Sequence, residues 1–241
     1  MDGASVSYGF SFELKGALSH DIQRERDFKY TGMDMSEIVK HIAQFTSDIW
    51  QIHPFCEGNT RTTAVFIIKY LRSLGFDVNN TTFEKNSWYF RNALVRANYQ
   101  NLQKGIYKET IHLERFFRNL LMGEDNVLMN RHLHIKAKEL LNGAAPSSTP
   151  SSTPTSTPTS VIPESENVKR LISAIAEKQL SVKEIMAAVG LKDRPNFIEY
   201  SLSPAMREGY VHMLYPDSPR HPRQKYLLTV KGLAAYKELS R

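Results

Sequence analysis

Apolar residues recur through most of the first 142 positions at the three- and four-residue intervals of helices that bury one face. The widest stripe follows Asp34, which forms a capping-box spacing with Glu37. This stripe predicts a buried central helix that ends shortly before His53. Further helices are predicted over 11–28, from about Asn59 to a stop at Gly75, over 88–99, over 110–122 and over 127–141, with a turn at 79–82.

Beyond residue 163 the pattern changes to helices followed by strands. It predicts three helices: one containing Val168 and Ile175, one from the capping box Ser181–Glu184 to Gly190, and one over 194–208. Two strands follow, at 210–215 and 224–229, and a last helix is predicted over 231–239. Three helices and a two-stranded ribbon resemble a winged helix-turn-helix domain. Residues 164–241 are therefore predicted to form a small winged helix (α+β) domain, after a mainly α domain over 1–142.

Residues 143–163 separate these two regions. They contain repeated Ser, Thr and Pro, no charged residue and few apolar ones. Such a composition buries too little apolar surface to offset the entropy lost on ordering. The segment is therefore predicted to be an extended linker.

Composition is that of a soluble globular protein, with 41% hydrophobic and 23% charged residues. No apolar run reaches the roughly 20 residues of a membrane helix, and the N-terminus lacks the pattern of a signal peptide. The single cysteine fits a reducing compartment, so a cytoplasmic protein is expected. Residues 164–241 carry 13 Lys and Arg against 9 Asp and Glu, a net charge of +4 out of +6 for the whole chain.

The chemistry gathers in residues 53–63, called the motif segment below. Gly58 tightens the chain before a helix start, where unpaired backbone N–H groups favour an anion. Arg61 offers a fork of donors for phosphate oxygens, and Glu57 is a hard oxygen ligand for Mg²⁺. His53 is a candidate general base for an incoming hydroxyl. This combination indicates nucleotide chemistry.

The motif segment resembles the signature of the Fic family: His53, Phe55, Glu57, Gly58-Asn59 and Arg61 fall at matching spacings. The resemblance implies a helical domain that transfers AMP from ATP to a Ser, Thr or Tyr hydroxyl of a target protein. It implies that His53 deprotonates the hydroxyl and that Glu57 binds Mg²⁺. The residues implied to hold the phosphates are Gly58, Asn59, Thr60 and Arg61.

The chain departs from the family pattern in two places. Thr60 stands where glycine is frequent, and Ala64 stands where a second arginine often grips the terminal phosphate and pairs with an inhibitory glutamate. The resemblance also implies a β-hairpin flap that clamps the target peptide. Its second strand would be Ser5, Val6, Ser7 and Tyr8, and the domain would be shortened at its N-terminus. By the same resemblance, Tyr89 and Phe90 are candidates to flank the adenine.

Two further hypotheses stay open beside the adenylyltransferase. One is a regulator that binds DNA or docks a protein through the winged helix, with a weakly catalytic Fic fold. The other is a Fic enzyme with a different nucleotide donor. Expected DNA contacts come from Arg194, Asn196 and Arg207 on the third helix, and from Arg220, His221, Arg223 and Lys225 on the wing. No membrane partner is expected, and a homo-oligomer is possible.

Overall fold

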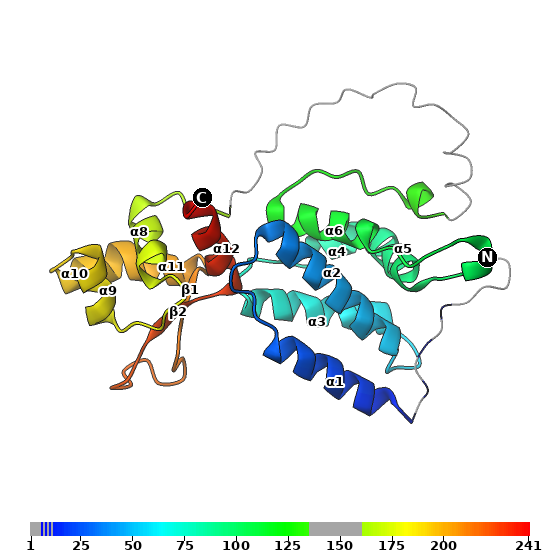
Figure 1. The fold of residues 1–241 in the computed structure, drawn as a ribbon, viewed down its shortest axis with the longest axis horizontal. Helices are drawn as coiled ribbons and strands as arrows, with labels where there is room; N and C mark the ends of the chain where they lie inside the picture. Colours follow the sequence, from blue (N-terminus) through cyan, green and yellow to red (C-terminus); the bar gives the residue numbers. More distant parts are fainter. Residues whose placement is uncertain (1–5, 7, 9, 11, 135–160) are drawn as a thin grey trace, which may run out of the picture. The chain divides into compact units, whose positions relative to one another are not determined.

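The computed structural model describes residues 6, 8, 10, 12–134 and 161–241, and the protein is mainly helical (Figure 1). The helices before residue 135 are α1 (Leu14–Asp27), α2 (Met35–Ile52), α3 (Asn59–Ser73), α4 (Thr81–Lys85), α5 (Ser87–Asn98) and α6 (Ile111–Met122). Short 3₁₀ turns form at η1 (Leu102–Lys104) and η2 (Asn130–Leu133). No helix in the described ranges has both the length and the hydropathy needed to cross a bilayer.

The central helix α2 begins and runs as predicted. Its capping box is present, because the Asp34 N–H donates to the Glu37 carboxylate at 2.7 Å and the Glu37 N–H donates to the Asp34 carboxylate at 3.0 Å. Its apolar stripe is buried, with Ile38 and Ile42 fully inaccessible to solvent. Helix α2 therefore delivers the chain to His53 from a fixed position.

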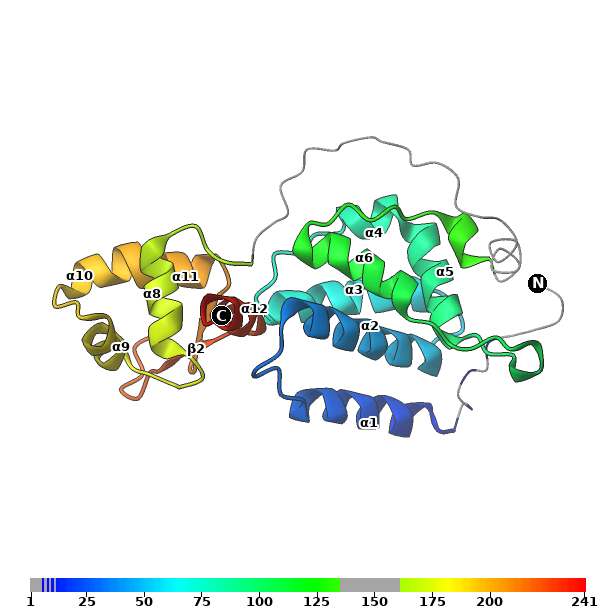
Figure 2. The same cartoon turned by 45° about the horizontal axis from the view of Figure 1, so that its top comes forward.

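Helices α4, α5 and α6 each contribute a phenylalanine to a cluster of aromatic rings. Helices α5 and α6 lie side by side (Figure 2). The rings of Phe83, Phe90 and Phe116 meet with centroids about 5 Å apart, at 5.0, 4.9 and 5.0 Å. Such offset and edge-on contacts are the favoured geometries for aromatic pairs. We call these residues, together with Tyr89 and His112, the aromatic core.

Three predicted elements differ from the structure. The helix predicted over 127–141 is wrong over its described part, where only the short turn η2 forms; residues 135–141 lie outside the described residues. The turn predicted at 79–82 covers only Asn79 and Asn80, where Asn79 accepts the Thr81 N–H at 2.9 Å, because α4 already begins at Thr81. The described residues of the predicted flap strand, Val6 and Tyr8, belong to no strand.

Past residue 160 the elements follow the predicted order. The helices are α8 (Glu166–Ile175), α9 (Val182–Val189), α10 (Arg194–Phe197), α11 (Ser203–Arg207) and α12 (Val230–Leu239), and a π-helical turn, η3 (Ile198–Leu202), joins α10 to α11. Strands β1 (Val211–Met213) and β2 (Tyr226–Leu228) pair antiparallel, with His212 opposite Leu227. Each strand is shorter than predicted. The apolar faces of α8 and α9 meet in one core, which includes Val168, Ile172 and Ile185.

The described chain divides into two compact units. The first consists of Met1–Phe28, Val39–Ile67 and Asn79–Thr159, and the second of Lys29–Ile38, Ile68–Val78 and Ser160–Arg241. The predicted boundaries, a domain over 1–142 and another over 164–241, stay predictions. The same holds for the linker over 143–163, because residues 143–160 lie outside the described residues.

Candidate active site

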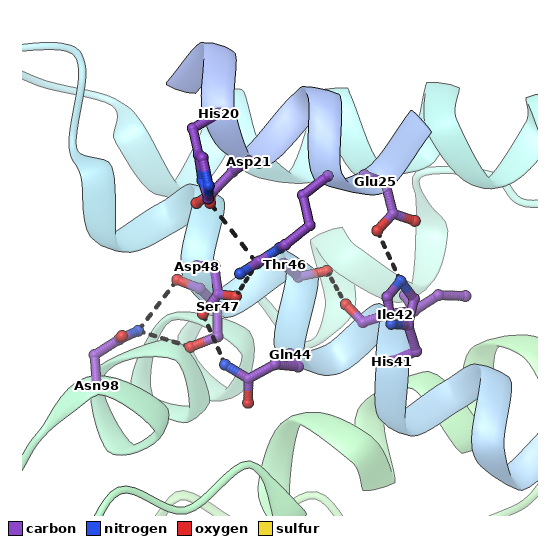
Figure 3. A network of polar contacts seen from close by, with 11 residues as sticks. His20, Asp21, Glu25, His41, Ile42, Gln44, Thr46, Ser47, Asp48 and Asn98 are labelled. Atoms are coloured by element: carbon purple, nitrogen blue, oxygen red, sulfur yellow. Dashed lines mark hydrogen bonds and ion pairs between the residues drawn. The ribbon is translucent and has the colours of Figure 1, made fainter. Parts of the chain in front are cut away.

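Polar contacts hold helix α2 against α1 and α5 (Figure 3). The Arg24 guanidinium on α1 donates to Asp48 at 2.7 Å, and the Asn98 amide on α5 donates to the Ser47 hydroxyl at 3.0 Å. Ser47 and Asn98 are buried, so their hydrogen bond is shielded from competing water. These contacts fix the last turns of α2, from which the candidate site extends.

The chain leaves α2 through an unusual backbone conformation at His53. Its φ angle is +54°, in the left-handed region that residues other than glycine rarely adopt. Such a conformation costs about 1–3 kcal/mol and is held only where the surroundings determine it. Among the described residues only Ala176 shares a positive φ without being glycine. Backbone strain thus coincides with the histidine that the sequence singled out.

The His53 imidazole is oriented by the backbone of α2. Its Nδ1 lies 3.1 Å from the Trp50 carbonyl oxygen. A carbonyl oxygen only accepts hydrogen bonds, so in the neutral ring Nδ1 carries the hydrogen and donates it. The lone pair is then on Nε2, which is the arrangement that a general base requires.

Trp50 connects the end of α2 to the start of α3. Its indole N–H donates to the Thr60 hydroxyl at 3.0 Å, and its ring meets that of His53 edge-on at 5.0 Å. Trp50 belongs to the apolar stripe that was predicted only to be buried, so its link to the site was missed. The available signal was its position in the last turn of the helix, three residues before His53.

Asn59 clamps the loop between His53 and α3. Its side-chain oxygen accepts the Phe55 N–H at 3.0 Å, and its side-chain amide donates to the Phe55 carbonyl at 2.6 Å. Only 5% of Asn59 is exposed, so these bonds satisfy groups that burial would otherwise leave unpaired. Asn59 therefore shapes the motif segment rather than projecting its side chain toward a ligand.

Three other motif residues surround the N-terminus of α3. Gly58 has a φ of +77°, which suits glycine, and a Cβ built on it would lie 3.6 Å from the Arg61 guanidinium. Arg61 therefore lies over the turn, and both it and Glu57 are exposed. The first N–H groups of α3 have no partner within the helix, since the Thr62 N–H is the first to bond back, to Gly58 at 2.9 Å. Cationic and backbone donors thus converge beside one carboxylate.

A metal held by protein side chains alone does not fit this site. In the described part of the chain, no group of three or more His, Cys, Asp or Glu side chains is placed to hold a metal ion. An exposed carboxylate near a helix N-terminus does fit Mg²⁺, which is typically bound by one or two carboxylates together with substrate phosphates and water. Glu57 is the residue in that position.

Tyr89 and Phe90 lie in the aromatic core. They are 3% and 2% exposed, and the Tyr89 hydroxyl donates to the His112 carbonyl oxygen at 3.1 Å. Burial raises the pKa of the Tyr89 phenol to about 12. These contacts are those of core residues, so the site described here does not include them as adenine neighbours. The aromatic residue of this segment that is exposed is Trp88, at 68%.

Of the predicted flap residues, Ser5 and Ser7 lie outside the described residues. Tyr8 stacks on the His53 imidazole, with ring centroids 3.8 Å apart and an angle of 35° between the rings. Tyr8 also meets Trp50 edge-on at 5.9 Å. The segment before α1 therefore reaches the candidate base, although without the predicted strand.

This arrangement defines a class of mainly helical proteins in which a histidine loop precedes a helix that opens with Gly-Asn. A family model described as the Fic/DOC family matches residues 10–71. A second, described as the C-terminal domain of filamentation induced by cAMP protein Fic-like, matches residues 166–229. Each matched segment covers about a quarter of the 241 residues, so the chain carries a Fic domain over 10–71 and a Fic-like C-terminal domain over 166–229.

Among solved structures, the chain is similar to a Fic family protein from Desulfovibrio desulfuricans G20. The two are 19% identical with a TM-score of 0.32, and the match covers 92% of this chain and 57% of the other. The chain therefore spans less than two thirds of that protein. No curated protein sequence matches the chain.

Proposed function

We propose that this protein transfers AMP from Mg·ATP to a Ser, Thr or Tyr hydroxyl of a target protein. The observation that carries the proposal is the geometry of His53. Its Nδ1 is engaged by the Trp50 carbonyl oxygen at 3.1 Å, which leaves Nε2 to accept a proton. The match of residues 10–71 to the Fic/DOC family, whose members are generally transferases, supports the same proposal.

In the proposed reaction, Nε2 of His53 takes the proton of the target hydroxyl. The hydroxyl oxygen forms a bond to the α-phosphorus, the bond from that phosphorus to the β-phosphate oxygen breaks, and pyrophosphate leaves. Arg61 and the first N–H groups of α3 stabilise negative charge that builds on the phosphate oxygens. Mg²⁺ supplies further neutralisation of that charge when bound, and Glu57 is the residue that would hold it.

The strained backbone at His53 has a role in this proposal. The φ of +54° turns the imidazole back onto the last turn of α2, where the Trp50 carbonyl oxygen fixes its orientation. A preoriented base avoids the reorganisation that a freely rotating side chain would need at the moment of reaction. The strain is thus part of how the base is positioned.

The test is to incubate the protein with host lysate and ATP labelled on either the α- or the γ-phosphate, beside labelled GTP, CTP and UTP. AMP transfer predicts protein bands labelled from α-labelled ATP and not from γ-labelled ATP. His53→Ala removes the base and should lower the rate by about 10²- to 10⁴-fold. A matched control is His20→Ala, because His20 is an exposed histidine on α1.

Two results would contradict the proposal. Transfer by His53→Ala within a few-fold of the unmodified protein would remove His53 from the reaction. Label retained from the γ-phosphate would identify phosphoryl transfer instead of nucleotidyl transfer. Label from GTP, CTP or UTP in place of ATP would keep the mechanism and change the donor.

A further inference from the structure

A groove of about 820 Å³ opens on the second unit, between α9, the turn from α9 to α10, and the loop that joins β1 to β2. We call it the α9 groove. Its volume is within the range of about 300–1,000 Å³ that is usual for ligand pockets. All of its lining residues belong to residues 181–226, so it is formed within the second unit alone.

Positive charge lines the rim of the α9 groove. The rim carries Lys183 from α9, Lys192 and Arg194 from the turn and start of α10, and Arg220 from the β1–β2 loop. All four side chains are exposed, and none of the described residues that line the groove is an aspartate or glutamate. The lining of the groove thus offers four cations and no carboxylate.

The two carboxylates nearest in the sequence are committed to helix caps. Glu184 accepts the Ser181 N–H at 2.7 Å, and Asp193 accepts the Asn196 N–H at 3.3 Å. The bond from Ser181 holds the pKa of the Glu184 carboxyl below its usual value. Neither side chain lines the groove, and the four cations of the rim outnumber these two carboxylates.

The floor of the groove is apolar. We use this name for the apolar residues of its lining, Val182, Met186, Leu191 and Tyr226, of which Leu191 is 41% exposed. An exposed leucine beside a concave surface favours an apolar partner group, because burial of apolar surface is worth about 25 cal/mol per Å². A cationic rim over an apolar floor selects a ligand with both properties.

We propose that the α9 groove binds an acidic segment of a partner protein that carries a leucine-like side chain among its carboxylates. Duplex DNA would use the rim through its phosphates and leave the floor unused. Of the residues expected to contact DNA, Asn196 and Arg207 from the third helix and Arg223 and Lys225 from the loop do not line the groove. The exposed face of the third helix also carries Glu199, which repels phosphate. This inference does not depend on the transfer reaction.

The experiment uses the full chain with His53→Ala, so that no transfer interferes. Its probe is a fluorescent hexapeptide, Glu-Asp-Leu-Leu-Asp-Glu, titrated at physiological salt and followed by anisotropy. In one matched peptide Gln and Asn replace the acidic residues, and in another Ser replaces both Leu residues. Mixed-sequence duplex DNA is titrated in the same way, for comparison with the peptides. We expect the acidic leucine peptide to bind most tightly, and each replacement to weaken binding at least about fivefold, since both rim charge and floor contribute.

Substitutions in the α9 groove itself test the same interaction. Lys192→Glu with Arg220→Glu should weaken peptide binding about tenfold or more, because two attractive charges become repulsive. Leu191→Ser should weaken it by about three- to tenfold through loss of apolar contact. Lys178→Glu is the control, since Lys178 is exposed on the same unit and does not line the groove. Circular dichroism and thermal unfolding verify that each variant is folded, and Lys192→Gln replaces the double variant if that one is not.

Three results would overturn the proposal. One is tighter binding of the duplex than of the peptide, with log K falling against log salt at a slope of about −4, as release of counterions from several phosphates requires. A second is no peptide binding up to millimolar concentration. The third is equal weakening by Lys178→Glu and by the groove variants, which would place the interaction outside the groove.

Discussion

The motif segment and the aromatic core both contain residue types that bind nucleotides, namely histidine, aromatic rings and arginine neighbours. In the motif segment, Glu57 and Arg61 are exposed and the backbone of His53 is strained. In the aromatic core, Phe90 is 2% exposed and His112 is 8% exposed. The comparison shows that residue type alone does not locate a site. The two regions differ in the exposure of their charged groups and in the orientation of their histidines.

His53 in the motif segment and His112 in the aromatic core differ in the surroundings of their Nδ1 atoms. Nδ1 of His53 has a partner in the Trp50 carbonyl oxygen, whereas Nδ1 of His112 is buried without a partner among the described residues. Burial lowers the pKa of His112 from 6.5 to about 4; Glu109 opposes this shift, and Arg115 and Arg96 add to it. His112 is therefore neutral at physiological pH and serves packing, whereas the His53 imidazole is oriented by the Trp50 carbonyl oxygen.

The largest expected effect is on stability in the aromatic core. Phe90→Ala should lower the free energy of unfolding by about 3–5 kcal/mol, because it leaves a cavity among packed rings. Phe55→Ala is the matched control, since Phe55 is 52% exposed, and it should change stability by less than about 0.5 kcal/mol. Urea unfolding measures both. Equal losses for the two variants would mean that the motif segment is packed as tightly as the core.

The next effect is pH-dependent. The folded-state pKa of His112 is lowered to about 4 from 6.5, so the unfolded chain takes up the proton first as pH falls. Stability from this group is therefore present above about pH 6.5 and is lost toward pH 4, by about 2 kcal/mol between pH 7 and pH 5.

His112→Phe removes the titrating group and its buried, unpartnered nitrogen. Urea unfolding of the variant at pH 7 and pH 5 should lack that loss, whereas the unmodified protein shows it. If the two proteins lose the same free energy between these pH values, His112 is not neutral in the folded state at pH 5.

A smaller effect is expected at Asn59, which is buried within the motif segment. Asn59→Ala removes both hydrogen bonds to Phe55 and should cost about 1–2 kcal/mol of stability. The rate of transfer should fall by a larger factor than stability implies, because the loop between base and helix loses its shape. Asn79→Ala is the control, since Asn79 makes one exposed bond at the start of α4. A transfer rate unchanged in folded Asn59→Ala would show that the clamp is not needed.

The smallest change in stability is expected at Glu57. Glu57→Gln should alter the free energy of unfolding by less than about 0.5 kcal/mol, because the side chain is exposed. The Mg²⁺ concentration needed for half-maximal transfer should nevertheless rise, since the proposed carboxylate ligand is lost. Glu84→Gln is the control, since Glu84 is an exposed residue of α4 outside the motif segment. Superimposable Mg²⁺ titrations for Glu57→Gln and the unmodified protein would place the metal elsewhere.

The sequence by itself determined the elements whose signals are local. The capping boxes at Asp34 and Ser181 depend on side chains three residues apart, and both are present in the structure. The stripe of α2 and the stop at Gly75 are equally local, because helical periodicity and a positive φ of +95° are encoded in adjacent residues. The spacing of the motif segment likewise identified the family.

Only the tertiary structure decided which of the candidate residues form the site. Tyr89 and Phe90 share the residue types of a nucleotide pocket, but packing between α5 and α6 buries them. Conversely, the stacking of Tyr8 on His53 and the bond from Trp50 to Thr60 join residues distant in sequence. The same is true of the α9 groove, whose cations come from α9, the turn that follows and the β1–β2 loop. Burial and long-range contacts are set when the elements pack together, and no spacing within one element specifies them.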